Sequence, residues 1–436
     1  MAKFLFAPIP FTGHVAPGLP IARELIERGH SVRWYTTHRF KSAVEKIGAT
    51  YLPMSMATEL DEARLNEQFP ERSSLKGLNQ LRYDIKRVFI DQVPPMLEDV
   101  TKAYKEDPAD VVVGDNLSGV AAMLSERFEI PWGTYGISVL GFPSLDAPPF
   151  GLNIIPGRSP VEKIRNRLLN WAVDHIVFKD SIAHFHAMRA THGFPRINDT
   201  PFTFARRADV YLQCGVSSFE YPRSDLPKNV RFIGAFVPSP PSEWKEPAWW
   251  PRLDSGRPVI LITQGTIAND YDELIRPGLR ALKNEDATII VTTGSNPPEA
   301  VDMPSLPENV IVEQFVPYAH LMPKVDLLLT NGGYGSVQIA LTHGVPVLAF
   351  GASEDKAEIA NRISWSGVGL GIRTKTPTGA QILRSVREIL GSTSYKERAA
   401  AMRKELAECD AAQTSGDLLE QLLPIKSRLK RLASTM

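Results

Sequence analysis

The chain has 436 residues, and its 49 lysine and arginine side chains balance 49 aspartate and glutamate side chains. This length favours two domains of roughly 200 residues each, and the balanced charge excludes an overall field that recruits nucleic acid or anionic lipid. No apolar run reaches the ~18 residues of a membrane span, and the amino terminus has no signal-type core. We therefore expect a soluble, cytoplasmic protein that binds small molecules.

The amino-terminal residues predict a βα unit with a histidine near the start of its helix. Residues 3–7 are typical of a strand, 8–14 of a loop and 17–28 of a helix. A later strand over 111–115 ends in Asp115. Within one parallel sheet, His14 and Asp115 would lie at the same edge, where a carboxylate supports an imidazole that takes up a proton. A structural histidine and a helix-capping aspartate are the alternative interpretation.

Two segments of the amino-terminal half lack a regular rhythm of strands and helices. Residues 54–95 and 137–192 mix aromatic, methionine and polar side chains. Because loops on a rigid scaffold commonly carry binding residues, we expect these segments to line an apolar pocket. Ordinary connecting helices are the alternative.

A regular alternation of strands and helices restarts after a segment rich in proline and tryptophan. Beyond it the chain alternates between a strand at 259–263, a helix at 272–283 and strands at 287–291 and 310–312. Such alternation predicts an α/β fold with a doubly wound parallel sheet. We predict an amino-terminal domain over 1–235, a linker over 236–258, a carboxyl-terminal domain over 259–420 and a final helix or tail over 421–436.

Residues 315–356 are the most informative stretch. They predict a strand at 327–330, a tight Asn-Gly-Gly-Tyr-Gly-Ser turn at 331–336, a helix at 337–342 and a second parallel strand at 345–350. The first amides of such a helix suit a diphosphate, and glycines let its oxygens approach the backbone closely. A glycine-rich turn that only closes a tight corner is the alternative.

This stretch resembles the nucleotide-sugar signature of the family 1 glycosyltransferases, the group that holds plant secondary-product and bacterial macrolide glucosyltransferases. The resemblance implies that Phe315 stacks on the base and that the backbone of Val316 pairs with the base edge. It also implies that Asn331, in place of the family's histidine, contacts the diphosphate. Further diphosphate contacts that it implies are Thr266, Gly333, Gly335 and Ser336.

The same resemblance assigns residues to the sugar and the ribose. Asp355 and Lys356 match the family's Asp-Gln pair, which hydrogen-bonds the sugar hydroxyls. The family's ribose-binding glutamate falls on Ile339, and Gln338 lies one residue earlier. We therefore expect Gln338 near the donor.

The amino terminus is similar to the family in a second place. Gly13-His14, followed by Pro17 and a long helix, matches the family's segment that carries the general base, which falls on His14. Asp115 matches the aspartate that orients this histidine, and Gly13 is expected to contact the donor. The resemblance implies the GT-B fold, in which two Rossmann-like domains face each other across a cleft.

Together these features predict an inverting, metal-independent glycosyltransferase that moves a sugar to a hydroxyl of an apolar phenol, polyketide or lipid. The resemblance favours UDP-glucose as donor, with a dTDP-sugar second, and no cofactor beyond this co-substrate. The two cysteines are far apart and no residues have metal-type spacing, so neither a disulfide framework nor a metal site is expected. A nucleotide-sugar epimerase or a non-catalytic nucleotide-sugar binder is the alternative. A nicotinamide oxidoreductase is disfavoured, because residues 8–13 lack G-x-G-x-x-G.

Overall fold

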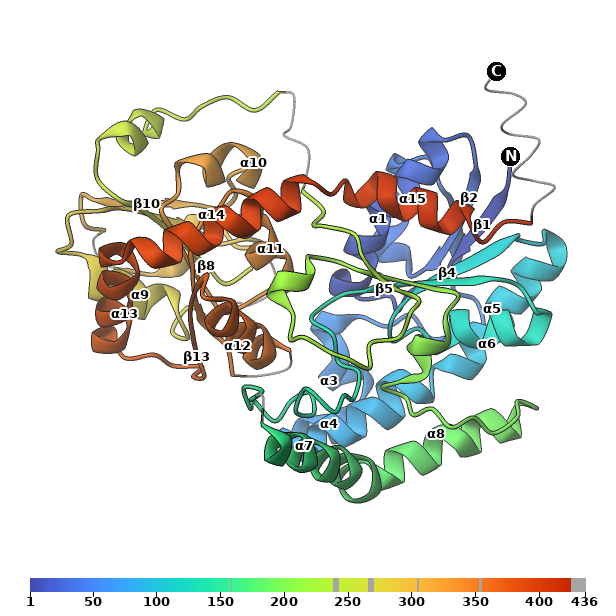
Figure 1. Ribbon diagram of the computed structural model, residues 1–436. Coiled ribbons are helices and arrows are strands. Elements are labelled where there is room, and N and C mark those ends of the chain that lie inside the picture. The colour runs from blue at the N-terminus through green and yellow to red at the C-terminus, as the bar shows by residue number, and fades with distance from the viewer. Residues whose placement is uncertain (158, 238–242, 266–269, 304–305, 353–354, 425–436) are drawn as a thin grey trace.

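Two α/β halves lie side by side, each built around one parallel sheet (Figure 1). The computed structural model describes residues 1–436 except 158, 238–242, 266–269, 304–305, 353–354 and 425–436. We call the half that contains strands β1 to β7 the first half, and the half that contains β8 to β13 the second half. The predicted fold class, α/β with two doubly wound sheets, is confirmed.

The seven described strands of the first sheet are parallel and have the order 3-2-1-4-5-6-7. The order changes direction between β1 and β4, and ligands of open α/β sheets bind beyond the carboxyl ends of strands at such a point. In that order the strands are β3 (Thr50–Pro53), β2 (Ser31–Thr36), β1 (Lys3–Phe6), β4 (Val111–Asp115), β5 (Trp132–Gly136), β6 (Val210–Gln213) and β7 (Val230–Phe232).

Helices cover both faces of the first sheet because alternate strand residues are apolar on both sides. Phe4 and Phe6 pack in one apolar cluster, and Leu5 and Ala7 in another. This alternation is the two-residue period of a strand that is buried on both faces. The first cluster includes residues of α1 (Thr12–Glu27), α2 (Lys41–Lys46) and α15 (Ala411–Glu420), and the second includes residues of α5 (Val93–Glu106), α6 (Gly119–Phe128) and α8 (Lys179–Thr191).

Helix α1 begins at Thr12, which corrects the sequence prediction of a loop through His14 and a helix from Pro17. The carboxylate of Glu62 accepts hydrogen bonds from the backbone N–H and the hydroxyl of Thr12. This carboxylate caps a helix whose own N-cap, Phe11, supplies no side-chain hydrogen bond. A cap from a distant segment leaves no signal in the local sequence, and it places His14 in the first turn of the helix.

The second sheet has six described parallel strands in the order 10-9-8-11-12-13. They are β10 (Val310–Glu313), β9 (Thr288–Thr292), β8 (Val259–Thr263), β11 (Leu327–Thr330), β12 (Val347–Phe350) and β13 (Gly369–Ile372). One face packs against α9 (Ile275–Leu282) and α13 (Gly379–Gly391), and the other against α11 (Tyr334–Thr342), α12 (Lys356–Ser366) and α14 (Thr393–Ala407). α10 (Tyr318–Leu321) follows β10.

Helices make up much of the two segments that lack a regular sequence rhythm, as the alternative interpretation of these segments expected, but residues 137–157 form a loop after β5. The first contains η2 (Glu62–Arg64), α3 (Leu65–Gln68), η3 (Pro70–Ser74), α4 (Gly77–Tyr83) and η4 (Asp84–Ile90). The second contains α7 (Pro160–Ala172), η5 (Val173–Val177) and α8. Other short turns of helix are η1 (His38–Phe40), η6 (Phe204–Arg207), η7 (Ser217–Phe219), η8 (Trp250–Asp254), η9 (Pro298–Val301) and η10 (Met322–Lys324).

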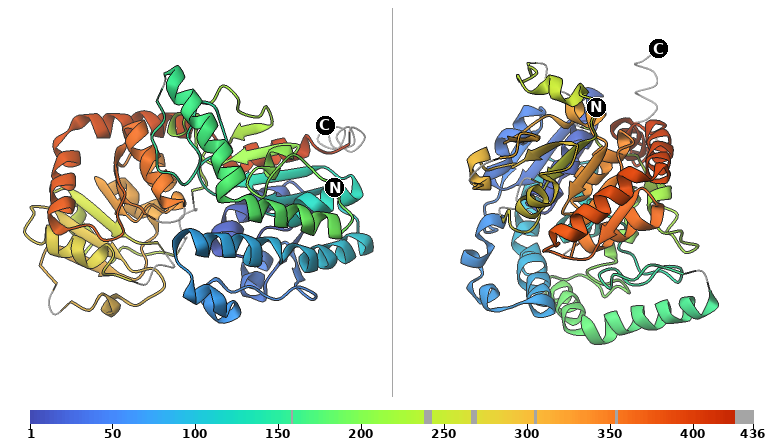
Figure 2. Two further views of the ribbon diagram at one scale, coloured as in Figure 1. Left: turned by 90° about the horizontal axis from the view of Figure 1, so that it is seen from below. Right: turned by 90° about the vertical axis from the view of Figure 1, so that its left-hand side faces the viewer.

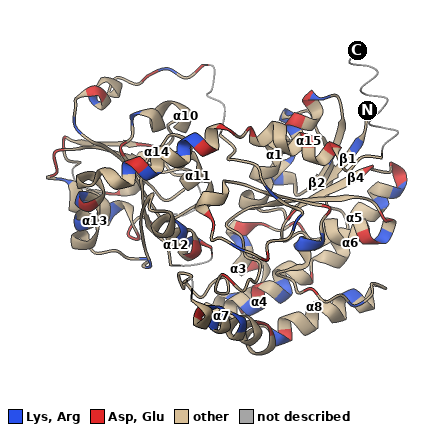
Figure 3. Ribbon diagram, in the orientation of Figure 1, with Lys and Arg blue, Asp and Glu red and all other residues tan. Residues whose placement is uncertain are grey.

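The chain enters the second half between β7 and β8 and returns to the first half after α14. After the second sheet, α14 runs back toward the first half, where α15 lies along α1 (Figures 1 and 2). Residues 411–420, which the sequence prediction includes in the carboxyl-terminal domain, thus pack on the first half. Charges of both signs are interspersed over the ribbon (Figure 3). Among the described residues, no helix combines the length and the apolar character needed to cross a bilayer.

Candidate active site

A cleft of about 2860 Å³ lies between the two halves, and residues of both halves line it. A pocket for a single small ligand typically holds ~300–1,000 Å³, so this cleft has room for two ligands. The two irregular segments contribute apolar side chains to its first-half wall, among them Leu78, Val88, Phe178 and Phe185. Of the predicted donor residues, Gly13 lines the cleft in the first half. Those that line it from the second half are Phe315, Val316, Asn331, Gly333, Gly335, Ser336, Gln338, Asp355 and Lys356.

His14 and Asp115 meet at the switch point of the first sheet. The Nδ1 atom of His14 lies 2.9 Å from Oδ1 of Asp115, which is fully buried at the end of β4. Asp115 also accepts hydrogen bonds from the backbone N–H groups of Ile9, at 2.7 Å, and Leu117, at 2.9 Å. Since a carboxylate only accepts, the ring proton of a neutral His14 lies on Nδ1, and Nε2 is the nitrogen left to take a proton.

Two further residues fix the backbone of this first helical turn. The hydroxyl of Tyr135, on β5, donates to the carbonyl oxygen of His14 at 2.7 Å. Burial raises the pKa of Tyr135 well above its ordinary value, so the hydroxyl keeps the proton that it donates. Gly18 provides the space, because a Cβ there would lie 2.6 Å from the Tyr135 hydroxyl oxygen. The position of His14 is therefore set by main-chain contacts as well as by Asp115.

The glycine-rich turn across the cleft has the features of an anion site. Gly332 has a φ of +90°, a left-handed conformation that favours glycine. A Cβ added to Gly333 or Gly335 would lie more than 4 Å from the surrounding atoms of the described residues, and both residues line the cleft. Helix α11 begins at Tyr334 without a side-chain cap. Its first amides therefore adjoin open space in the cleft, where a diphosphate would gain from them and from the helix dipole.

Asn331 connects this turn to the loop after β8. Its Nδ2 atom donates to the carbonyl oxygen of Gln264 at 2.9 Å, and its side chain is buried. One amide proton of Asn331 is thus engaged within the protein. Ser336 lines the cleft beside it. Thr266, the predicted hydroxyl ligand of the same loop, lies outside the described residues.

Phe315 and Val316 differ sharply in exposure. Phe315 follows β10, lines the cleft and is 67% exposed, whereas Val316 is buried in the core of the second half. An exposed aromatic ring on a cleft wall is an open face for stacking. Contact of the base with the ring of Phe315 and with only the backbone of Val316 stays a prediction.

Asp355 and Lys356 lie where β12 gives way to α12, and both line the cleft. The hydroxyl of Ser138, in the loop after β5, donates to Oδ2 of Asp355. A first-half side chain therefore reaches the carboxylate that the sequence prediction assigns to the sugar. Sequence reasoning missed Ser138, because a serine in a loop carries no signal of a partner in the other half.

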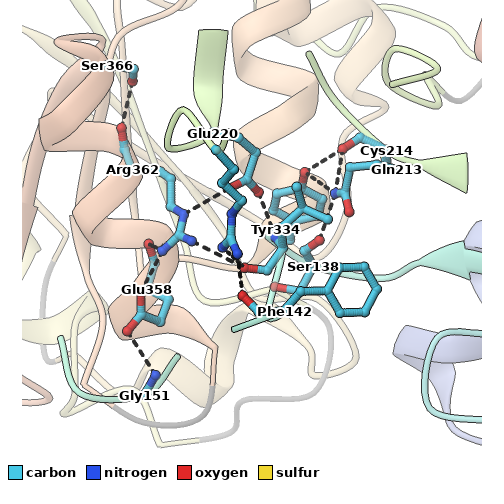
Figure 4. A network of polar contacts seen from close by, with 12 residues as sticks. Ser138, Phe142, Gly151, Gln213, Cys214, Glu220, Tyr334, Glu358, Arg362 and Ser366 are labelled. Atoms are coloured by element: carbon cyan, nitrogen blue, oxygen red, sulfur yellow. Dashed lines mark hydrogen bonds and ion pairs between the residues drawn. The ribbon is translucent and has the colours of Figure 1, made fainter. Parts of the chain in front are cut away.

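Gln338 is buried, and neither its Nε2 nor its Oε1 has a hydrogen-bond partner among the described residues. It lines the cleft. A Cβ built on Gly215, in the first half, would lie 3.0 Å from Oε1 of Gln338 and from the hydroxyl of Tyr334. The Tyr334 hydroxyl donates to the carbonyl of Cys214 at 2.6 Å and accepts from Gln213 (Figure 4). The start of α11 is thus fastened to the end of β6.

The chain is similar to known glycosyltransferases along nearly its whole length. Residues 277–420 match the family model described as erythromycin biosynthesis protein CIII-like, C-terminal domain. The chain is 40% identical to 4'-demethylrebeccamycin synthase of Lentzea aerocolonigenes, over 97% of this chain and 100% of the relative. It is 33% identical to UDP-glycosyltransferase 2 of Phaeomoniella chlamydospora, over 96% and 95% of the two chains.

Solved structures show the same fold. The glycotransferase of kitacinnamycin aligns with a TM-score of 0.75 at 22% identity, over 97% of this chain and 99% of its own. The calicheamicin glycosyltransferase CalG4 aligns with a TM-score of 0.74 at 20% identity, over 97% and 98%. Relatedness along nearly the whole chain, together with two Rossmann-like halves around one cleft, shows that this protein belongs to the family 1 glycosyltransferases and has the GT-B fold.

Proposed function

We propose that the protein is an inverting, metal-independent O-glycosyltransferase that moves glucose from UDP-glucose to a hydroxyl of an apolar small molecule. The hydrogen-bonded His14–Asp115 pair in the cleft, opposite the glycine-rich turn, carries the proposal. A non-catalytic nucleotide-sugar binder has no need of such a pair. The names of relatives support the acceptor and donor classes, since they include 4'-demethylrebeccamycin synthase and UDP-glucosyltransferase A1 of Starmerella bombicola.

In the proposed reaction, Nε2 of His14 takes the proton of the acceptor hydroxyl while the oxygen attacks the anomeric carbon. The bond between that carbon and the diphosphate oxygen breaks, and its electron pair leaves with UDP. Asp115 stabilises the imidazolium that forms. The start of α11, with Gly333, Gly335 and Ser336, stabilises the charge on the leaving diphosphate without a metal ion.

Attack on the face opposite the leaving group inverts the configuration of the anomeric carbon. The donor hexose is proposed to lie against Asp355 and Lys356, and the base against Phe315. A dTDP-sugar is the second candidate donor, because two structures of the same fold hold thymidine diphosphate, with TM-scores of 0.66 and 0.67.

The test is to incubate the protein with a panel of UDP- and dTDP-sugars and a mixture of phenols and polyketides, and to detect products by mass spectrometry. We expect a hexose adduct from UDP-glucose with the native protein and a much smaller yield with His14→Ala. The anomeric proton coupling of the isolated product should report a β-glycoside. An α-glycoside would contradict inversion, and equal yields from the native protein and His14→Ala would remove His14 from the mechanism.

A further inference from the structure

The proposed general base and the proposed sugar-binding carboxylate lie in different halves of the protein. His14 lies on α1 in the first half, and Asp355 lies at the start of α12 in the second. A buried network of charged side chains joins α12 to the first half beside the cleft (Figure 4). Its members Arg362, Glu358 and Glu220 are 2%, 3% and 4% exposed.

Arg362 is the centre of this network. Its Nη1 contacts Oε2 of Glu358, one turn earlier on α12, at 2.5 Å. Its Nε lies 3.3 Å from Oε2 of Glu220, and its Nη2 lies 3.4 Å from the carbonyl oxygen of Leu140, both in the first half. The guanidinium also lies 3.9 Å from the ring centre of Tyr221. One side chain of α12 thus contacts the first half at three places.

The loop after β5 is held from both ends. Near its start, the Leu140 N–H donates to Glu220 at 2.7 Å, and its carbonyl also accepts from Arg223 at 2.8 Å. Farther along, the N–H groups of Gly151 and Asn153 donate to Oε1 of Glu358 at 2.9 and 3.2 Å. The loop that carries Leu140 and Gly151 therefore lies between α12 and the first sheet. The two carboxylates that bind this loop, Glu220 and Glu358, both belong to the network around Arg362.

The network is balanced in charge and depends on each member. Two guanidinium groups, of Arg362 and Arg223, face two carboxylates, of Glu220 and Glu358. Burial lowers the pKa of Arg223, whereas the neighbouring Glu220 and Glu358 outweigh the effect of burial on Arg362 and raise its pKa. Loss of one partner leaves an uncompensated buried charge, so such a network holds one geometry or opens as a unit.

We propose that Arg362, Glu358 and Glu220 form an interdomain clasp that sets the position of Asp355 relative to His14, so that all three are positioning residues for sugar transfer. The proposal rests on the proposed function for its catalytic consequence. Arg362 lies seven residues after Asp355, or ~10 Å along a helix, which is a rigid connection. A shift of the clasp therefore moves the sugar-binding end of α12 with it.

The expected consequence is a loss of rate without a loss of nucleotide binding. The base and diphosphate sites, Phe315 and the turn before α11, lie within the second half and do not use the clasp. The reacting atoms, in contrast, come from both halves, and a misplacement of about 1 Å costs roughly 10²-fold in rate. Disturbing the clasp should therefore lower kcat and leave UDP affinity nearly unchanged.

The first variant is Arg362→Lys, which keeps the positive charge and removes the planar fork that joins Glu358, Glu220 and Leu140. Arg189→Lys is the matched control. Arg189 is also 2% exposed and pairs with a carboxylate, Glu126, at 2.9 Å, but both lie within the first half. If Arg362→Lys does not fold, Glu358→Gln replaces it, because the amide oxygen still accepts from the loop while Arg362 loses one of its two carboxylate partners.

Interdomain geometry is measured directly by double electron–electron resonance. Spin labels are placed at Lys102→Cys on α5 and Arg384→Cys on α13, which are both exposed and lie in different halves. Cys214 and Cys409 are replaced by alanine in every variant. This distance requires no knowledge of the substrate, so it tests the clasp even when the proposed reaction fails.

We expect Arg362→Lys or Glu358→Gln to broaden or shift the distance distribution and to lower kcat by roughly 10- to 100-fold, with UDP affinity changed less than about threefold. Arg189→Lys should leave both the distance and kcat unchanged. An unchanged distance in the clasp variants would overturn the proposal, whatever the activity. An equal loss of rate in Arg189→Lys would also overturn it, since general destabilisation would then explain the effect.

Discussion

Replacing Asp115 by asparagine tests the proposed catalytic pair, because an amide can accept only some of the hydrogen bonds of this carboxylate and carries no negative charge. Oδ1 accepts from His14 and from the Leu117 N–H, both at 2.9 Å, and Oδ2 accepts from the Ile9 N–H at 2.7 Å. Asparagine has one acceptor oxygen and one donor nitrogen. In either orientation, the amide nitrogen of asparagine faces a backbone N–H group, of Ile9 or of Leu117, which is also a donor.

The two orientations have different effects. If the amide oxygen faces His14, the Ile9 N–H loses its acceptor, which costs about 1–3 kcal/mol of folding free energy. If the amide nitrogen faces His14, it donates to Nδ1 and forces the ring proton onto Nε2, where it blocks proton uptake. Both orientations remove the negative charge that stabilises the imidazolium. We expect kcat to fall by roughly 10²- to 10⁴-fold, as for loss of general-base catalysis or of the correct tautomer in a Ser-His-Asp triad.

Initial rates of glucoside formation, followed by liquid chromatography and mass spectrometry, measure this loss. Calorimetric titration with UDP should show unchanged affinity, because the diphosphate turn lies in the second half. Asp99→Asn is a matched control, since Asp99 is also a buried carboxylate that accepts several hydrogen bonds, from Ser55, Met56 and Tyr35, away from His14. An Asp115→Asn variant whose kcat stays within about threefold of the native value would refute the reasoning.

Three further predictions address nucleotide binding at the donor site, the stability of the protein at low pH and the activity in the absence of metal ions. Asn331→Ala should weaken UDP binding by roughly 10- to 150-fold in calorimetry, because it removes the predicted charge-assisted hydrogen bond to the diphosphate and the observed link to Gln264; unchanged affinity would exclude Asn331 from the diphosphate site. The hydrogen bond from Lys163, with those from Ser224, lowers the pKa of Asp146 to about 2, so its contribution to stability is complete above the unfolded pKa of about 3.9 and is lost as the pH falls through 2. Urea unfolding of Asp146→Asn should therefore depend less on pH between about 4 and 2 than that of the native protein, and an identical pH dependence would contradict this assignment. Glucosyl transfer should survive excess chelator, because the helix start supplies the positive partial charge, and a loss that Mg²⁺ restores would contradict the metal-independent mechanism.

The sequence predicted what local pattern and topology determine. The strand, glycine-rich turn, helix and strand around Asn331 were predicted within two or three residues of their ends, because apolar runs and glycines mark such units locally. The meeting of His14 and Asp115 followed from topology, since strands of one parallel sheet end at the same edge. Neither prediction required knowledge of side-chain packing.

Contacts between distant segments could not be predicted in this way. The early start of α1 depends on Glu62, and the clasp joins Arg362 to residues 142 and 222 positions earlier in the chain. A glutamate in an irregular segment and an arginine within a helix are ordinary surface residues by composition. Only the packing of the two halves makes Arg362 a buried residue, so its importance is a property of the tertiary structure.

The return of the chain to the first half affects how the protein can be recombined with its relatives. Arg28, which directly follows α1, pairs with Asp417 at 2.6 Å and with Glu420 at 3.2 Å, and Leu419 packs in the same apolar cluster as residues of α1. A hybrid enzyme that takes everything after the linker from a relative would replace this helix and lose its fit to α1. A hybrid intended to change donor preference should exchange residues 259–407 and keep the native α15, so that the first half retains its own last helix.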